Sequence, residues 1–144
     1  MHKPYIEQQV SRALSEDLNG QSAFDGDITA QLIPPTQQAI GKVITREFAI
    51  ICGVEWVNET MQQVDSSLEV EWFVKDGDVA KPNQTLFIVK GPARAILTAE
   101  RTALNFLQTL SATATTTHQY VCEVKALGST TKILDTRKTI PGLR

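Results

Sequence analysis

Hydrophobic residues recur along this chain with helical spacing in three regions. On a helix, apolar residues three or four positions apart form one stripe that can be buried against a core. A proline just before such a stripe and a glycine just after it mark where a helix begins and ends. The predicted helices lie between Pro4 and Gly20, between Gly53 and Val64, and between Pro92 and Gly128.

Shorter segments between the helices are rich in β-branched residues or alternate between apolar and polar positions, and both patterns predict strands. These strands cover 40–45, 48–52, 68–75 and 84–90. We expect the first two strands to pair with each other. The sequence Asp76-Gly77-Asp78 predicts a turn, after which the chain returns as the last strand.

The polar segment that follows the first helix carries two acidic residues. Asp27 is suited to cap a short helical turn over residues 28–33. Asp25 and Asp27 could instead form an acid pair or a metal site. No third ligand is evident, so loop and capping chemistry is the better interpretation of this segment.

Composition limits the classes of protein to which this chain can belong. With 144 residues and 42% hydrophobic content, the chain can bury a core of its own. A net charge of −2 argues against a general nucleic-acid surface, which needs an excess of basic residues. No apolar run approaches the roughly 20 residues of a membrane span, and the first residues lack a secretory pattern. We therefore expect a cytoplasmic protein.

Cysteine and histidine give little support for a disulfide or a metal site. Cys52 and Cys122 are far apart and lie among apolar residues, which predicts two buried free thiols. His2 and His118 have no partners at the spacing of zinc ligands. We interpret His118 as a helix-face histidine rather than a catalytic base.

Two cations stand between two threonines near the end of the chain. Residues 136–139 read Thr-Arg-Lys-Thr, after the apolar pair Ile133-Leu134 and before Pro141. The apolar pair can start a buried strand, and proline suits the first turn of a helix. A strand, a basic loop and a helix start together make an anion site, because free N–H groups and the helix dipole add to the side-chain charges. By itself, however, such a tetrapeptide is most often a solvated loop.

Three blocks of sequence carry a more specific signal. Residues 26–29 read GDIT, residues 100–111 read ERTALNFLQTLS, and residues 135–144 read DTRKTIPGLR. In this order they resemble the quinolinate phosphoribosyltransferase family, the decarboxylating nicotinate-nucleotide pyrophosphorylases of NAD synthesis, and they span nearly the whole chain. The resemblance implies a pentosyltransferase that converts quinolinate and phosphoribosyl pyrophosphate to nicotinate mononucleotide, pyrophosphate and carbon dioxide.

Arg101 lies in the second block, between Leu97 and Leu104 on one side of the long predicted helix. From the residues alone, a surface arginine at the edge of the apolar stripe is the better interpretation. The resemblance implies a different role. In this family the matching arginine reaches into the active site of the partner subunit and holds a substrate carboxylate, so a homodimer, or a higher oligomer, is expected.

The resemblance also assigns substrate-binding roles in the third block. Arg137 is expected to bind quinolinate together with Arg101, because a guanidinium donates two parallel hydrogen bonds to a carboxylate. Lys138 is expected to bind phosphoribosyl pyrophosphate, with Thr136 contributing loop contacts. Mg²⁺ is the expected cofactor of that substrate, although we assign no metal ligand and no catalytic residue to this chain.

The implied architecture has two parts. Residues 1–112 are expected to form an α+β N-terminal domain with a barrel-sandwich-like sheet and helices. Residues 113–144 are expected to form a connecting helix and then the first strand and loop of an open α/β barrel that breaks off. Because the active sites of such barrels gather at the ends of several strands, we expect this chain to be catalytically inactive by itself.

Two other functions stay open at this point. A related enzyme of the same architecture could act on another base, as in the pyrophosphorylase-like protein linked to molybdate transport. Residues 76–86 are similar to half of a biotinyl or lipoyl carrier domain, but the lysine motif of such carriers is missing. The sequence also has Ala112-Thr113 where the family usually has glycine and a branched residue, which favours continuous helix there.

Overall fold

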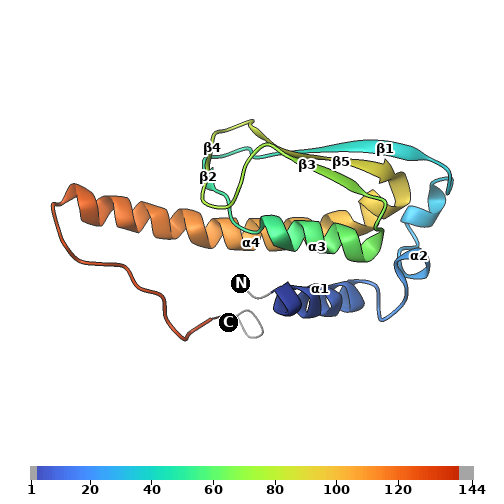
Figure 1. Cartoon of the computed structure of the whole chain (residues 1–144), viewed down its shortest axis with the longest axis horizontal. Helices are drawn as coiled ribbons and strands as arrows, with labels where there is room; N and C mark the ends of the chain where they lie inside the picture. The colour runs from blue at the N-terminus through green and yellow to red at the C-terminus, as the bar shows by residue number, and fades with distance from the viewer. Residues whose placement is uncertain (1–2, 140–144) are drawn as a thin grey trace.

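Two small antiparallel sheets lie over a layer formed by the helices α3 (Val54–Val64) and α4 (Ala93–Ala126), and α1 (Lys3–Asp17) packs beneath that layer (Figure 1). The computed structural model describes residues 3–139. Its helices are α1 (Lys3–Asp17), α2 (Ala23–Gly26), the 3-10 helix η1 (Ala30–Leu32), α3 (Val54–Val64) and α4 (Ala93–Ala126). Its strands are β1 (Gln38–Ile44), β2 (Ala49–Ile50), β3 (Glu69–Trp72), β4 (Val79–Ala80) and β5 (Thr85–Pro92).

Strand β5 is the centre of the larger sheet. It pairs antiparallel with β1 on one side, from Gln38 opposite Pro92 to Ile44 opposite Thr85, and with β3 on the other side. Leu86, Phe87 and Val89 of β5 are buried. A strand that is apolar along most of its length is suited to this central position, where neighbours and helices cover it.

The predicted pairing of 40–45 with 48–52 is wrong. Although both segments form strands, β1 pairs with β5, and β2 pairs with β4 in a separate two-stranded sheet. Strand propensity is a property of each segment, whereas the choice of partner depends on distant parts of the chain. The connection at 45–48 carries the chain from one sheet to the other.

The three long helices occur where the hydrophobic spacing predicts them. The buried residues of α1 are Ile6, Val10 and Leu14, which pack on Trp56 of α3 and form a second core cluster. The main core lies between the larger sheet and the inner face of α4. Its largest fully buried side chain is Phe87, and α4 contributes Ile96, Ala99, Ala103 and Leu107.

Helix α4 runs without interruption through Ala112 and Thr113, as the alanine in place of glycine favours. The helix ends before Gly128, which has a φ of +66° and donates its N–H to the carbonyl of Lys125. This is the left-handed geometry that glycine supplies at helix ends. Within residues 3–139, no helix is apolar over enough of its length to cross a membrane.

The acidic turn between β3 and β4 has a function that its sequence does not reveal. Asp76 Oδ1 accepts the backbone N–H groups of Gly53 at 2.8 Å and Val54 at 3.0 Å. These groups lie at the start of α3, where helical N–H groups have no partner within the helix. The turn therefore caps a helix that precedes it by more than 20 residues.

The expected barrel strand at Ile133-Leu134 is not formed. Residues 129–139 contain no strand in the structure, and Ile133 and Leu134 are 44% and 76% exposed. A strand needs a neighbour for its N–H and C=O groups, and in the described chain none lies beside this segment. It turns back along α4 instead (Figure 1). The α+β class is confirmed, whereas the helix predicted at Pro141 lies outside the described residues.

Candidate functional site

Arg101 is on the exposed side of α4. Its side chain is 64% exposed, and its Nε lies 2.8 Å from Asp17 Oδ1, with which it forms an ion pair. Leu97 beside it is 42% exposed and Leu104 is half-buried, so Arg101 lies at the edge of the apolar stripe rather than within it. Within this chain, Arg101 is therefore the surface arginine that its residue pattern predicts. Its role in a neighbouring subunit stays a prediction.

The second predicted group of site residues lies on the segment after α4. Thr136 Oγ1 accepts the backbone N–H of Lys138 at 2.8 Å, which forms a local turn around Arg137. All three residues are exposed. The turn places Arg137 and Lys138 on a loop, as predicted, but the strand expected before that loop is absent.

The four predicted site residues thus occupy two different elements. Arg101 is linked to the end of α1, whereas Thr136 and Lys138 contact each other in the terminal segment. The contacts described for Arg101 do not involve Thr136 or Lys138. The assignment of Arg101 and the terminal segment to one substrate site therefore stays a prediction.

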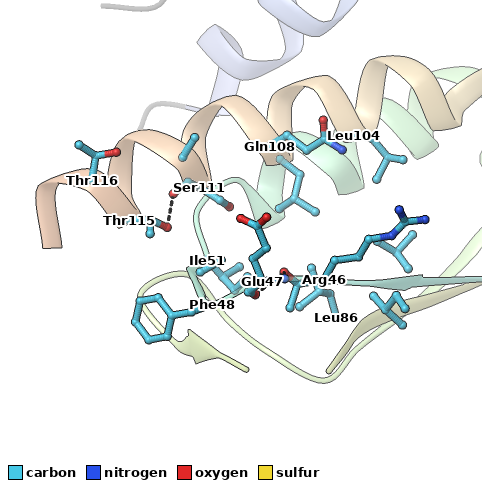
Figure 2. A pocket seen from close by; sticks show the side chains of 16 residues that line it. Arg46, Glu47, Phe48, Ile51, Leu86, Leu104, Gln108, Ser111, Thr115 and Thr116 are labelled. Carbon is cyan, nitrogen blue, oxygen red and sulfur yellow. Dashed lines mark hydrogen bonds between the residues drawn. The ribbon is translucent and has the colours of Figure 1, made fainter. Parts of the chain in front are cut away.

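One cavity in the described part of the chain was not predicted from the sequence. It is a cleft of about 680 Å³ between the β1–β2 connection and the middle of α4 (Figure 2). The side chains of Arg46 and Glu47 extend into the cleft, and Phe48 lies at one end. Ala112 is also in the lining. Arg46 and Glu47 look like ordinary turn residues in the sequence, so no spacing signal identifies this cleft.

The hydroxyl groups of the cleft join β2 to α4. Thr115 Oγ1 donates to the carbonyl of Ser111 at 2.7 Å and accepts the N–H of Ile50 at 2.9 Å (Figure 2). Ser111 Oγ accepts the N–H of Cys52 at 3.0 Å. Since these hydroxyls already have backbone partners, we assign them a structural role and place no catalytic group here.

Asp27 is a structural residue, as its capping interpretation predicts. Its Oδ1 accepts the N–H of Ala30 at 3.0 Å, and its Oδ2 accepts the hydroxyl of Thr98 in α4 at 3.1 Å. Asp25 Oδ2 accepts a hydrogen bond from the hydroxyl of Ser22 at 2.7 Å. Across the described part of the chain, no group of three histidine, cysteine or acidic side chains could hold a metal ion.

Both cysteines are free thiols, but only Cys52 is partly buried. Burial, with a smaller contribution from the negative charge of Asp76, raises the pKa of the Cys52 thiol. Cys122 is exposed, so its predicted burial is wrong: it lies on the outer side of α4, four residues from His118. His118 is on the helix face, as expected, with its Nε2 3.4 Å from the Cys122 sulfur.

We expect iodoacetamide to alkylate Cys122 faster than Cys52 at pH 8, by at least about tenfold. Only the thiolate reacts, and a raised pKa together with burial reduces both its fraction and its access at Cys52. Mass spectrometry of the native chain over time measures both rates. Urea should remove the difference, and equal rates in the native chain would contradict this prediction.

Comparisons with known proteins agree with the sequence blocks. Residues 27–111 match the family model described as quinolinate phosphoribosyl transferase, N-terminal domain. A mitochondrial quinolinate phosphoribosyltransferase (decarboxylating) from Nicotiana tabacum is 37% identical over 145 residues, which cover 99% of this chain and 39% of that protein. A nicotinate-nucleotide pyrophosphorylase (carboxylating) from Mycobacterium leprae is 38% identical over 94% of this chain and 46% of its own length.

A solved structure of the nicotinate-nucleotide pyrophosphorylase from Francisella tularensis has the same fold over 99% of this chain. Its TM-score is 0.90 at 41% sequence identity, and the match covers 48% of that protein. This chain thus spans less than half of the length of each of these relatives. The family model, the two relatives and the shared fold together show that the chain belongs to the quinolinate phosphoribosyltransferase family and corresponds to its N-terminal portion.

Proposed function

We propose that this chain contributes substrate-binding residues to a quinolinate phosphoribosyltransferase of NAD biosynthesis. The observation that carries the proposal is the exposed guanidinium of Arg101 in a chain of this family. Its ion pair with Asp17 occupies Nε and leaves the two terminal nitrogens for another carboxylate.

The chemistry of the two cationic segments fits the two proposed substrates. Quinolinate carries two carboxylates, and arginine forks bind planar carboxylates through two hydrogen bonds. Arg101 and Arg137 are the proposed quinolinate ligands. Lys138 is proposed to bind phosphoribosyl pyrophosphate, since its ammonium group is a compact charge that suits phosphate oxygens. Thr136 keeps the loop turned through its bond to the Lys138 N–H.

The proposed reaction is displacement at the anomeric carbon of the ribose. The pyridine nitrogen of quinolinate forms the new bond, and pyrophosphate leaves with the electron pair of the broken C–O bond. The 2-carboxylate is then lost as carbon dioxide, and the electron pair of that C–C bond stays on the ring carbon, which takes up a proton from solvent. The cations of this chain would hold the two anionic substrates close together, which lowers the entropic part of the barrier. Among the described residues, no group of three histidine, cysteine or acidic side chains could hold a metal ion, so no side chain of this chain is assigned to the expected Mg²⁺.

A homodimer would bring the two segments into one site. Arg101 belongs to α4, while Arg137 and Lys138 belong to the segment that follows it. We propose that Arg101 of one protomer meets the Arg137-Lys138 pair of a second copy, so that each site draws cations from both.

Titration of quinolinate into the intact chain tests this proposal. Binding is the appropriate readout, because it reports on these two side chains without requiring turnover. Loss of charge-assisted hydrogen bonds at two arginines should weaken binding by at least about tenfold in the Arg101→Ala, Arg137→Ala double variant. Calorimetry at low salt measures the dissociation constant.

Two controls sharpen this titration. Arg12→Ala removes a positive charge from an exposed position on α1 and should leave quinolinate binding unchanged. Nicotinate, which has one carboxylate, should bind more weakly than quinolinate to the original chain. Equal quinolinate affinity in the double variant and the original would contradict the proposal and favour a non-enzymatic binding module.

A further inference from the structure

Asp17 is an acidic residue at an unfavourable place in its helix. It is the last residue of α1, and the last turn of α1 contains no basic residue. The carbonyl end of a helix carries partial negative charge, so a carboxylate is disfavoured there and a cation is preferred. Local preference therefore does not explain an aspartate at this position.

The second oxygen of Asp17 makes this placement more costly. Asp17 Oδ2 is buried and has no hydrogen-bond partner within the described residues. A buried oxygen without a partner loses its interaction with water. The contact of Asp17 with Arg101 is an ion pair, and the Arg101 side chain is largely exposed. Ion pairs of this kind contribute little to stability. A contribution to the stability of the fold therefore does not explain why an aspartate occupies this position.

The ion pair nevertheless gives Arg101 a defined orientation. Asp17 Oδ1 lies 2.8 Å from Nε in an ion pair, and Nε is the nitrogen nearest the aliphatic part of the side chain. A contact at this nitrogen fixes the guanidinium plane without using the terminal pair of nitrogens. Those two nitrogens form the fork that binds a carboxylate through parallel hydrogen bonds.

Asp17 is attached to a rigid part of the molecule. Leu14 and Leu18 on either side of it are buried, and the N–H of Leu18 donates to the carbonyl of Leu14 at 2.9 Å. The N–H of Gly20 donates to the carbonyl of Ser15 at 2.7 Å and closes the helix end. A carboxylate held by packed backbone is a fixed acceptor, whereas the arginine side chain alone has many rotamers.

We propose that Asp17 is a positioning residue for Arg101, which it holds with its terminal nitrogens turned outward to receive the carboxylate of a substrate. This inference rests on the proposed role of Arg101 in quinolinate binding. By fixing one rotamer in advance, Asp17 reduces the ordering cost that binding would otherwise impose on a long side chain.

Variants of Asp17 distinguish a positioning role from a simple charge effect, because the two predict opposite changes in quinolinate affinity. Removal of a carboxylate beside Arg101 makes the surroundings more positive, and charge alone would then tighten the binding of an anion. Loss of positioning should instead weaken quinolinate binding in Asp17→Ala, by about threefold to tenfold. Asp17→Asn keeps an oxygen acceptor of the same shape, so it should bind quinolinate within about twofold of the original chain or more tightly.

Glu16→Ala is the matched control. It removes the adjacent, exposed carboxylate from the same helix end and should leave quinolinate binding equal or slightly tighter. Arg101→Ala is titrated in parallel. Unchanged or tighter binding in Asp17→Ala, with weaker binding in Arg101→Ala, would overturn this inference and leave the proposed function intact. Unchanged binding in Arg101→Ala would overturn both.

A second measurement does not depend on quinolinate or on the alanine variant folding. In the ¹⁵N spectrum of the intact chain, the Nε–H of Arg101 should exchange with solvent more slowly than that of Arg12. The Asp17→Asn variant should retain part of this protection. Equal exchange at the two arginines of the original chain would contradict the proposal, because it would show that Asp17 does not hold Nε.

Discussion

Replacement of Phe87 by alanine is expected to lower the free energy of unfolding by about 3–5 kcal/mol. Phe87 is 0% exposed in the central strand β5, and its ring lies 4.5 Å from that of Trp72, measured between centroids. The substitution removes this buried surface and leaves a cavity between the sheet and α4. Urea denaturation followed by circular dichroism measures the loss, which is a large part of the roughly 5–15 kcal/mol that stabilises a domain.

Phe73→Ala is the control for this prediction. Phe73 follows directly after β3 and is 51% exposed, so the same chemical change removes much less buried surface. We expect a loss below about 1.5 kcal/mol. Similar losses at the two positions would show that the core is not centred on β5.

Gly53→Ala is expected to lower the free energy of unfolding by about 2–4 kcal/mol, through backbone strain and crowding together. Gly53 has a φ of +120° directly before α3, a conformation that L residues rarely adopt. A Cβ atom here would lie 3.2 Å from Leu110 Cδ1 and 3.4 Å from the Cα atom of Leu107 in α4. The close approach of α3 to α4 therefore depends on a residue without a side chain. Thermal and urea unfolding measure this effect.

Gly77→Ala separates the two causes. Gly77 also has a positive φ, +90°, but no atom lies within 4 Å of the position that its Cβ would take. In this variant only backbone strain should act, and the free energy of unfolding should fall by about 1–2 kcal/mol. If Gly77→Ala cost as much as Gly53→Ala, crowding between α3 and α4 would have no measurable part.

These two core positions bear on the candidate site because they support α4, which carries Arg101. Phe87 belongs to the core cluster between the larger sheet and α4, and Gly53 is packed against the middle of α4. A loss of quinolinate binding in either variant would be indirect. The variants of Arg101, Arg137 and Asp17 are informative because they change exposed or partly exposed side chains and leave the core intact.

The family and the long helices could be predicted from the sequence. Helical periodicity is a local property, since residues three or four positions apart determine which side of a helix is apolar. The same holds for Asp27, whose capping contact with Ala30 spans three residues. Arg101 lies on an exposed face of α4, and Arg137 and Lys138 lie on a loop, in the local structures that the sequence predicts for them.

The errors arose where the answer depended on distant partners. The segment 48–52 contains a strand, yet its partner is β4 and not the strand before it. Ile133 and Leu134 have the character of a buried strand but have no neighbouring strand in the described chain. The predicted burial of Cys122 failed for a local reason: Val121 and Val124 are half-buried on one side of α4, whereas Cys122 lies on an exposed side.

By itself, the sequence determined the family, the α+β class, the three long helices and the residue types that could bind anionic substrates. Only the tertiary structure decided which strands pair, that Asp76 caps α3, that a cleft lies beside Arg46 and Glu47, and that Asp17 reaches Arg101. The physical reason is the range of the interactions. Periodicity and capping act within a few residues, whereas these contacts form only when packing brings distant elements together.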